Sequence, residues 1–579
     1  MGKHRLVSAL VVLALSIGSA QGLAMATDAL PDEQWTLATD QSNSGQELLG
    51  FRVQENVDLP YSKMTGSDES NPGLPEQSKA RLCTSARGAF CGVGASNFQS
   101  VLAPCQSAEE TNCLESISAI SESGTVINGR RKGSIPIAGY TDFQADQQWN
   151  VPAGAAPSTW IIPGVTHGGA SDEYLVSAQV RGGRSAASAK YGISSYSISI
   201  SPVTEVKGDY SRPKSTDSTS RLIKYPECET RHTPCGIALD GWQYPKCASV
   251  DDGLCALRQK FPEGYRFKIS IRLAQSPTGW FHGRMSRPDI SIKQVGSGVL
   301  ISFEAQPVVV PVIGVLQPRS GLSQEILSYY ADTNRRSSGS ASGWGNPGPN
   351  NFINVLVQPD SDAQDAFDQF ALWSTVIKNT ASASPTMWTV RTLNVPQETN
   401  SCLSNPNILS GIVTTNSMAY SPGPPTYSKD SGTLDYKVAS PHLTSAGQVF
   451  EGTYDLQIRS EVARCVYGFT DAPVAASVSI INDSGESRVT STTVTEKDGW
   501  FKLGAYGFTF SSPTLKVKLT QPKLPPAVVP TPVAPTPVAA PTPVVAKPLI
   551  KSITCTKGKT KVVVKGASPK CPTGYKKVA

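Results

Sequence analysis

The twelve cysteines constrain the fold of this chain more than any other feature, because most of them fall in close pairs. Outside a reducing compartment, an even set of this kind usually forms disulfides. Pairing each cysteine with its neighbour is the working hypothesis, although a sequence cannot fix the connectivity. The candidate pairs are Cys83 with Cys91, Cys105 with Cys113, Cys228 with Cys235, Cys247 with Cys255, Cys402 with Cys465, and Cys555 with Cys571.

Zinc binding is the alternative use of such cysteines, and their spacing argues against it. No Cys-x-x-Cys occurs, and the nearest histidine, His232, lies between Cys228 and Cys235. Structural zinc sites are usually built from closely spaced cysteine and histidine pairs. We therefore expect structural disulfides, no metal site and no cofactor.

The first 26 residues predict an export signal. A basic head, MGKHR, precedes the 13-residue apolar run LVSALVVLALSIG, and cleavage is possible at Ala20, Ala24 or Ala26. The apolar run is short for a membrane span, and no later stretch approaches 18 apolar residues. An N-terminal membrane anchor is the alternative. We expect a secreted protein, extracellular or associated with the cell wall, with no transmembrane segment in the mature chain.

The composition of the body and the alternation of its residues predict a mainly β fold. Charged residues make up only 17%, against 49 glycines and 44 prolines, which favours strands and turns over helices. Alternation of apolar and polar residues predicts half-buried strands at 173–182, 196–203, 265–274 and 288–295. The predicted fold class is multidomain and mainly β, with disulfide-braced, sandwich-like domains and one notable helix.

That helix is predicted within 360–379, DSDAQDAFDQFALWSTVIKN, with Asp360 or Asp362 as its N-cap. Its apolar residues recur with helical spacing, so we expect one face of the helix to be buried. The expected face consists of Ala363, Phe367, Phe370, Ala371, Ser374 and Ile377.

A proline-rich stretch separates the body from a small basic tail. Ten of the 28 residues of 521–548 are proline, which excludes a helix or a sheet and predicts a disordered, extended spacer. The predicted parts are a signal peptide at 1–26, a partly irregular region at 27–130, a β-rich domain at 131–318 with a disulfide-rich insert, a β-rich domain with one helix at 319–520, the linker at 521–548 and the tail module at 549–579.

The tail predicts a small cationic hairpin that turns near Gly558 and is stapled by Cys555 and Cys571. From Gln521 onward the chain has ten lysines and no acidic residue, whereas the body is acidic, which argues against general nucleic-acid binding. The expected partner is an anionic cell-wall polymer or envelope surface; a basic end that only aids solubility is the alternative. The candidate binding residues are Lys557, Lys559, Lys561, Lys565, Lys570, Lys576 and Lys577, with Lys551 beside them.

Four short motifs in the tail carry a resemblance. They are ITC at 553–555, KGKT at 557–560, PKCP at 569–572 and GYKK at 574–577. This pattern resembles a C-terminal module of uncharacterised exported proteins of high-GC Gram-positive bacteria. The segments 463–480 and 498–519 are similar to the ends of such proteins. The resemblance covers about a fifth of the chain and implies neither an activity nor catalytic residues.

The body has no recognisable catalytic signature. Its four histidines, His167, His232, His282 and His442, are isolated, and no H-E-x-x-H, G-x-S-x-G or phosphate-binding Gly-Lys motif occurs. A serine hydrolase assembled from distant residues, with His167 or His442 as its base, is the alternative.

Aromatic residues in turns offer a binding hypothesis. Trp242 and Tyr244 lie in a cysteine-rich loop and Trp344 in a Gly-rich one, where their rings would contact a glycan or a partner protein; packing at the edge of a core is the alternative.

The leading prediction is a secreted, non-enzymatic envelope or surface protein retained by its basic tail. The alternatives are a secreted hydrolase acting on glycan or peptide, and a carbohydrate-binding adhesin. The oligomeric state is not predicted.

Overall fold

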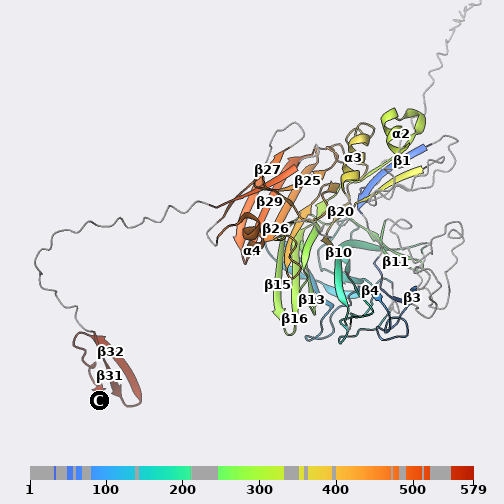
Figure 1. Cartoon of the computed structure of the whole chain (residues 1–579). Coiled ribbons are helices and arrows are strands. Elements are labelled where there is room, and N and C mark those ends of the chain that lie inside the picture. The colour runs from blue at the N-terminus through green and yellow to red at the C-terminus, as the bar shows by residue number, and fades with distance from the viewer. Residues whose placement is uncertain are drawn as a thin grey trace, which may run out of the picture. The chain divides into compact units, whose positions relative to one another are not determined.

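The computed structural model forms two compact units, the body Met1–Pro522 and the tail unit Lys523–Ala579 (Figure 1). The residues that it describes are 32–33, 48–55, 60–67, 80–136, 143–188, 190–208, 210, 246–331, 351–357, 363–393, 400–470, 474–481, 491–510, 514–521 and 550–578. The predicted signal peptide and nearly all of the predicted linker lie outside these residues.

Strands dominate the structure, which confirms the predicted fold class. Strands account for 54% of it and helices for 7%, in several sheets. All four segments predicted from alternation fall on strands. These are β9 (Glu173–Arg184), β10 (Gly192–Lys207), β13 (Tyr265–Leu273) and β15 (Ser286–Val295).

A 15-stranded sheet runs through most of the body. Its main path, in spatial order, is β28 (Ser491–Lys497), β29 (Trp500–Thr509), β26 (Glu451–Arg459), β22 (Leu409–Thr415), β14 (Gly279–Arg284), β21 (Thr389–Leu393), β10, β9, β4 (Ser96–Val101), β2 (Lys63–Ser67) and β3 (Ala80–Leu82). Beside this path lie β7 (Arg130–Ser134), β8 (Ser158–Ile161), β11 (Cys247–Asp251) and β12 (Leu254–Arg258). Strands from all three predicted body regions are thus interleaved in this sheet.

A second sheet of five strands packs against the first to form a sandwich. Its order is β15, β16 (Gly298–Gln306), β13, β5 (Cys113–Ser121) and β6 (Val126–Asn128), and β13, β15 and β16 lie side by side in Figure 1. Ile198 of β10 belongs to the same buried core as Ile271 and Phe303 of the second sheet. Because side chains alternate along a strand, the residues between these apolar ones face the other way.

Smaller sheets complete the body. One of them has three strands, in the order β18 (Ile313–Pro318), β1 (Leu48–Glu55) and β19 (Asn351–Val357). Another consists of two short strands, β17 (Val308–Val309) and β20 (Thr386–Met387). A five-stranded sheet contains β23 (Ala419–Tyr420), β25 (Thr433–Ala439), β30 (Thr514–Thr520), β27 (Ala475–Ile481) and β24 (Thr426–Ser428).

The predicted helix is present as α3 (Ala363–Trp373), and it is shorter than expected. It buries Phe367 and Phe370 as predicted, but Ala371 is exposed and Trp373 is buried instead, stacked on Phe51 of β1 with ring centroids 5.0 Å apart. The helix ends before Ser374 and Ile377, so these cannot extend its buried face. Asp360 and Asp362 lie outside the described residues.

Two further helices were not predicted. They are α2 (Gln324–Ala331) and α4 (Ser460–Tyr467), each of eight residues, and so too short to show a clear helical repeat in the sequence. Gly468 ends α4 in the left-handed conformation, with φ of 67°, which a glycine adopts without a steric penalty. Within the described part of the chain, no helix has the length and apolar character needed to span a bilayer.

Five of the six predicted disulfides are present, each between the neighbours that were paired in the hypothesis. They are Cys83–Cys91, Cys105–Cys113, Cys247–Cys255, Cys402–Cys465 and Cys555–Cys571. Cys228 and Cys235 lie outside the described residues. Cys402–Cys465 has the longest span, 63 residues, and attaches α4 to the turn that precedes β22.

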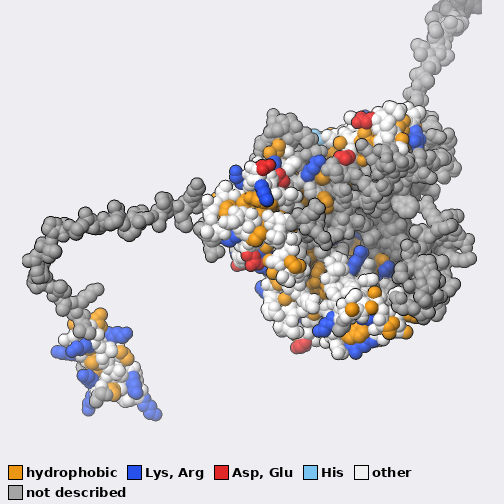
Figure 2. Space-filling model, viewed as in Figure 1, with side chains coloured by type: hydrophobic (Ala, Val, Ile, Leu, Met, Phe, Trp, Pro, Cys, Tyr) orange, Lys and Arg blue, Asp and Glu red, His pale blue; other side chains and the backbone are white. Residues whose placement is uncertain are grey.

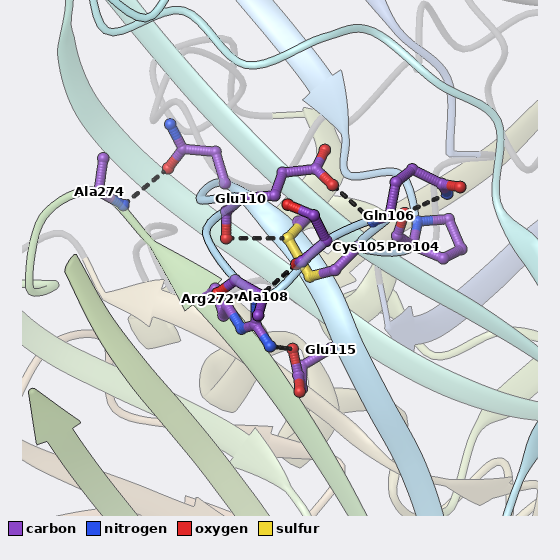
Figure 3. The surroundings of a disulfide bond; sticks show 11 residues. Pro104, Cys105, Gln106, Ala108, Glu110, Glu115, Arg272 and Ala274 are labelled. Carbon is purple, nitrogen blue, oxygen red and sulfur yellow. Dashed lines mark hydrogen bonds and ion pairs between the residues drawn. A yellow bond between two sulfur atoms is a disulfide. The ribbon is translucent and has the colours of Figure 1, made fainter. Parts of the chain in front are cut away.

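The loop closed by Cys105–Cys113 shows how a short disulfide loop is fixed to a sheet (Figure 3). Arg272 of β13 donates hydrogen bonds to the carbonyl oxygens of Ser107 and Ala108, at 2.7 and 2.6 Å. The same guanidinium forms an ion pair with Glu115 of β5, at 2.5 Å. One side chain therefore connects the loop to two strands of the five-stranded sheet.

A buried ion pair joins two sheets of the body. Arg284 of β14 donates two hydrogen bonds to Glu55 of β1, at 2.9 and 2.7 Å, and each side chain is 1% exposed. The remaining guanidinium hydrogens point to the carbonyl oxygens of Thr415, Ser417 and Met418. Every donor of this guanidinium thus has an acceptor, which offsets the cost of removing the charge from water.

A second buried carboxylate lies where the two sandwich sheets meet. Asp455 of β26 accepts hydrogen bonds from the hydroxyls of Thr414 and Tyr506 and from the backbone N–H of Arg287. Burial raises the pKa of Asp455 from 3.8 to about 6, against the opposing effect of these donors. The carboxyl group therefore keeps its proton to higher pH in the folded protein than in the unfolded chain.

We expect Glu55→Ala to lower the free energy of unfolding by about 3–5 kcal/mol, because it leaves the buried Arg284 charge without its counter-charge. Asp289→Ala is the matched control: its ion pair with Lys502 is more exposed, and its loss should cost less than about 1 kcal/mol. Urea unfolding followed by tryptophan fluorescence measures both changes. Equal losses would show that the buried pair contributes no more than a surface pair.

We expect the stability difference between wild type and Asp455→Asn to depend on pH. Because the folded-state pKa is raised, the wild-type advantage is greatest below about pH 4 and is lost as the pH rises through about 6. At 1.36 kcal/mol per pKa unit, the change is on the order of 3 kcal/mol. Urea unfolding of both proteins at pH 4 and pH 7 tests this expectation, and parallel pH profiles would contradict it.

Candidate functional site

The tail unit is a three-stranded antiparallel sheet in the order β32 (Thr560–Gly566), β31 (Lys551–Lys557) and β33 (Lys576–Lys577). The predicted hairpin is confirmed, and Gly558 has a φ of 61°, as two-residue hairpin turns require. Cys555 is fully buried in this small sheet and is bonded to Cys571 of the following loop. The disulfide fixes this loop against the central strand.

All predicted tail lysines are exposed. The strand register divides those that lie on strands between the two faces of the sheet. Thr556 pairs with Lys561 and with Lys576, and Ser552 pairs with Lys565, so these lysines share one face. The opposite face carries Cys555, Lys557 and Lys577. Figure 2 shows Lys and Arg side chains spread over the tail unit. We name the face with Lys561, Lys565 and Lys576 the lysine face.

The body contains a cavity that the sequence did not reveal. It has a volume of about 160 Å³, and its floor is the polar side of β9, β10 and β21. Ser197 of β10 pairs with Gln179 of β9 and with Arg391 of β21, and Ser199 pairs with Ser177. The alternation that directs Ile198 into the sandwich core directs these polar residues into the cavity.

Three arginines line this cavity from different strands. Arg258 of β12 donates a hydrogen bond to Ser201 at 3.1 Å, and Arg181 of β9 to Gln179 at 3.5 Å. Arg391 also lies 3.7 Å from Glu55, so it connects the cavity to the buried ion pair. Burial lowers the pKa of Arg258 from 12.5 to about 10, and its guanidinium remains charged at neutral pH.

The rim of the cavity holds a carboxylate from the N-terminal part of the chain. Glu33 accepts hydrogen bonds from the backbone N–H and the hydroxyl of Thr386, at 3.4 and 3.3 Å. Thr386 itself lines the cavity. Burial raises the pKa of Glu33 to about 7, despite the lowering effects of Thr386 and Lys260.

The histidines have structural contacts. His167 is buried: its Nε2 lies 3.1 Å from the carbonyl oxygens of Glu173 and Val203, and its Nδ1 accepts the N–H of Gly169. Nδ1 of His442 lies 3.2 Å from the carbonyl oxygen of Phe510. Burial lowers the pKa of both His167 and His282, and the ring of His282 stacks on Tyr420 at 3.9 Å. None of these contacts places a histidine beside a serine hydroxyl.

The other candidate residues are not placed by the structure. Trp242, Tyr244, Trp344 and His232 lie outside the described residues. Among the residues that are described, no group of three or more His, Cys, Asp or Glu side chains is arranged to hold a metal ion.

The signal for the cavity was present in the sequence but ambiguous. Serines at 195, 197, 199 and 201 alternate with the apolar residues of β10, and this pattern equally describes a strand with one face in solvent. Whether such a polar face lies in solvent or encloses a cavity depends on strands that are remote from β10 in the sequence. Here these strands are β12, which contains Arg258, and β20.

No protein-family model, characterised protein or solved structure matches this chain. The assignment of function therefore depends on the chemistry of the lysine face and of the cavity.

We expect the double substitution Cys555→Ser and Cys571→Ser to unfold the tail unit. The disulfide closes a 16-residue loop, worth roughly 3 kcal/mol, in a unit that has little other core. Limited trypsin digestion followed by mass spectrometry should show cleavage after Lys561 and Lys565 at least about tenfold faster, with body fragments appearing at an unchanged rate. Unchanged tail cleavage would show that the sheet is stable without its disulfide.

Proposed function

We propose that this chain is an exported, non-enzymatic envelope protein whose β-rich body is retained at an anionic cell-wall polymer by the tail unit. The observation that carries this proposal is the exposure of eight lysines in the tail unit, whose fold is held by the Cys555–Cys571 disulfide. The described residues of this unit, 550–578, include no acidic side chain. The predicted signal peptide, the five disulfides and the resemblance to exported proteins support the location.

The lysine face suits a repeating polyanion. Lys561 and Lys565 lie on the same side of β32, and Lys576 lies on that side of β33, so the three ammonium groups project from one face of the sheet. Each lysine near an anionic surface contributes about 1 kcal/mol. Salt shortens the range of this attraction, from about 10 Å at 0.1 M to about 3 Å at 1 M, so retention should be sensitive to salt.

A catalytic role has less support. A general base must lie within hydrogen-bond reach of the proton that it takes. His167 and His442 contact main-chain groups instead, as described above. The adhesin alternative depends on Trp242 and Trp344, which the structure does not describe.

Deletion of 549–579 should release the protein from the cell wall into the medium. The full-length protein should be released by about 0.5 M NaCl, because its attachment is electrostatic. Fractionation of cells into wall, membrane and medium, followed by immunoblotting, measures both effects. A deletion variant that stays in the wall fraction would refute the proposal.

A pair of charge-matched variants tests the lysine face itself. The triple substitution Lys561→Gln, Lys565→Gln and Lys576→Gln should weaken binding to immobilised poly(glycerol phosphate) by about a hundredfold, taking about 1 kcal/mol for each lysine. The control triple, Lys557→Gln, Lys570→Gln and Lys577→Gln, removes the same charge elsewhere and should cost less. Equal losses would show that total charge matters rather than the face, and two unaffected variants would refute polymer binding by the tail.

A further inference from the structure

We propose that the cavity over β9, β10 and β21 binds an acidic sugar, a small ligand with one carboxylate and several hydroxyl groups. This inference is independent of the tail unit, since it concerns a separate site in the body. It depends on the composition of the cavity lining, on the serine hydroxyls of its floor and on the carboxylate at its rim.

The charge of the lining selects an anion. Arg181, Arg258 and Arg391 line the cavity, and no acidic side chain is among its described lining residues. Glu33, which is bound to Thr386 at the rim, is close enough for its charge to act on Arg258, so the arginines outnumber the carboxylates there by three to one. A guanidinium group is planar and presents paired N–H donors that match the two oxygens of a carboxylate. Arg181 is exposed at the surface and Arg391 half-buried, so the positive charge extends from the entrance toward the floor.

The serines of the floor suit a ligand with hydroxyl groups. Ser177 is 5% exposed, and its hydroxyl has no hydrogen-bond partner within the described part of the chain, as is true of Ser197 and Ser199. Each serine hydroxyl offers one donor and two acceptor positions, the same set that a sugar hydroxyl offers. None of these hydroxyls is closed off from the cavity, so a polyol bound there could donate to them and accept from them.

A carboxylate of the chain is already bound beside the cavity, at Thr386. The backbone N–H and hydroxyl of Thr386 already hold the side chain of Glu33, at 3.4 and 3.3 Å. Because Glu33 uses both donors of Thr386, a ligand carboxylate that entered the cavity would be bound by the guanidinium groups of the lining instead.

The size of the cavity limits the ligand. A volume of about 160 Å³ lies below the 300–1,000 Å³ of sites for drug-sized molecules. The cavity therefore accommodates one sugar ring and not a length of polysaccharide. Pro60, a partly exposed residue of the lining, provides apolar surface for the carbon side of the ring.

Titration of the full-length protein with galacturonate, galactose and acetate tests the proposal by calorimetry. Galacturonate should bind with a Kd below about 1 mM, and galactose and acetate at least tenfold more weakly, because each lacks half of the recognised groups. Equal affinity for acetate would show an anion site without sugar recognition and would overturn the proposal, as would the absence of saturable binding of galacturonate.

Variants locate the binding. Arg181→Gln and Ser199→Val should each weaken galacturonate binding at least about fivefold, since they remove a charge and a hydroxyl from the lining. Arg130→Gln and Ser291→Val are matched controls on strands β7 and β15, outside the cavity lining, and should leave the Kd unchanged. We avoid Arg391, because it also lies beside Glu55.

The lysine-face triple variant separates this site from the tail. It should bind galacturonate with wild-type affinity, even if it no longer binds poly(glycerol phosphate). Loss of galacturonate binding in this variant, with Arg181→Gln and Ser199→Val unaffected, would assign the ligand to the tail and overturn the cavity proposal while leaving the proposed function intact.

Discussion

The alternation of side chains along β9 and β10 places two environments on either side of one sheet. Ile198 packs into the sandwich core, while Ser197 and Ser199, one residue away on either side, line the cavity. A shift of one residue in the pairing of these strands would exchange the two sets. The long antiparallel register between β9 and β10, from Pro202–Tyr174 to Gly192–Gly183, prevents this exchange and positions Gln179 and Arg181 beside the serines.

Buried charge connects this sheet to its neighbours. The pair of Glu55 with Arg284 joins β1 to β14, and Arg391 lies between Glu55 and the cavity. Asp455 links β26 to β15, β22 and β29 through its three hydrogen bonds. A buried charge is costly when it loses its partners. Arrangements of the sheets that would separate these groups are therefore disfavoured. In this way the polar floor of the cavity has a fixed geometry.

The two candidate sites would bind anions by different physical means. The lysine face has exposed, separately hydrated ammonium groups, and its attraction for a polymer comes from several weak contacts that salt screens. The cavity is partly enclosed, and its arginines and serines would bind one small molecule under our proposal. An envelope protein with both would be held in place by one and would contact a soluble or terminal acidic sugar with the other.

Local sequence was enough to predict the features that depend on near neighbours. Neighbouring cysteines paired as expected, and alternation located β9, β10, β13 and β15. The tail hairpin followed from Gly558 and its flanking strands. Apart from Cys402–Cys465, which spans 63 residues, each of these depends on residues close together in the sequence, where local geometry restricts the outcome.

Contacts between distant residues were decided only by the tertiary structure. In the sequence, β14 belongs with the strands before 318, yet it lies between β22 and β21. Trp373 replaces Ala371 on the buried side of α3 because Phe51, more than 300 positions earlier, packs against it. The alternation of β10 predicted a polar face, but only the packing of β12 and β20 beside it made that face a cavity, because enclosure depends on which strands meet in space and no local pattern records that.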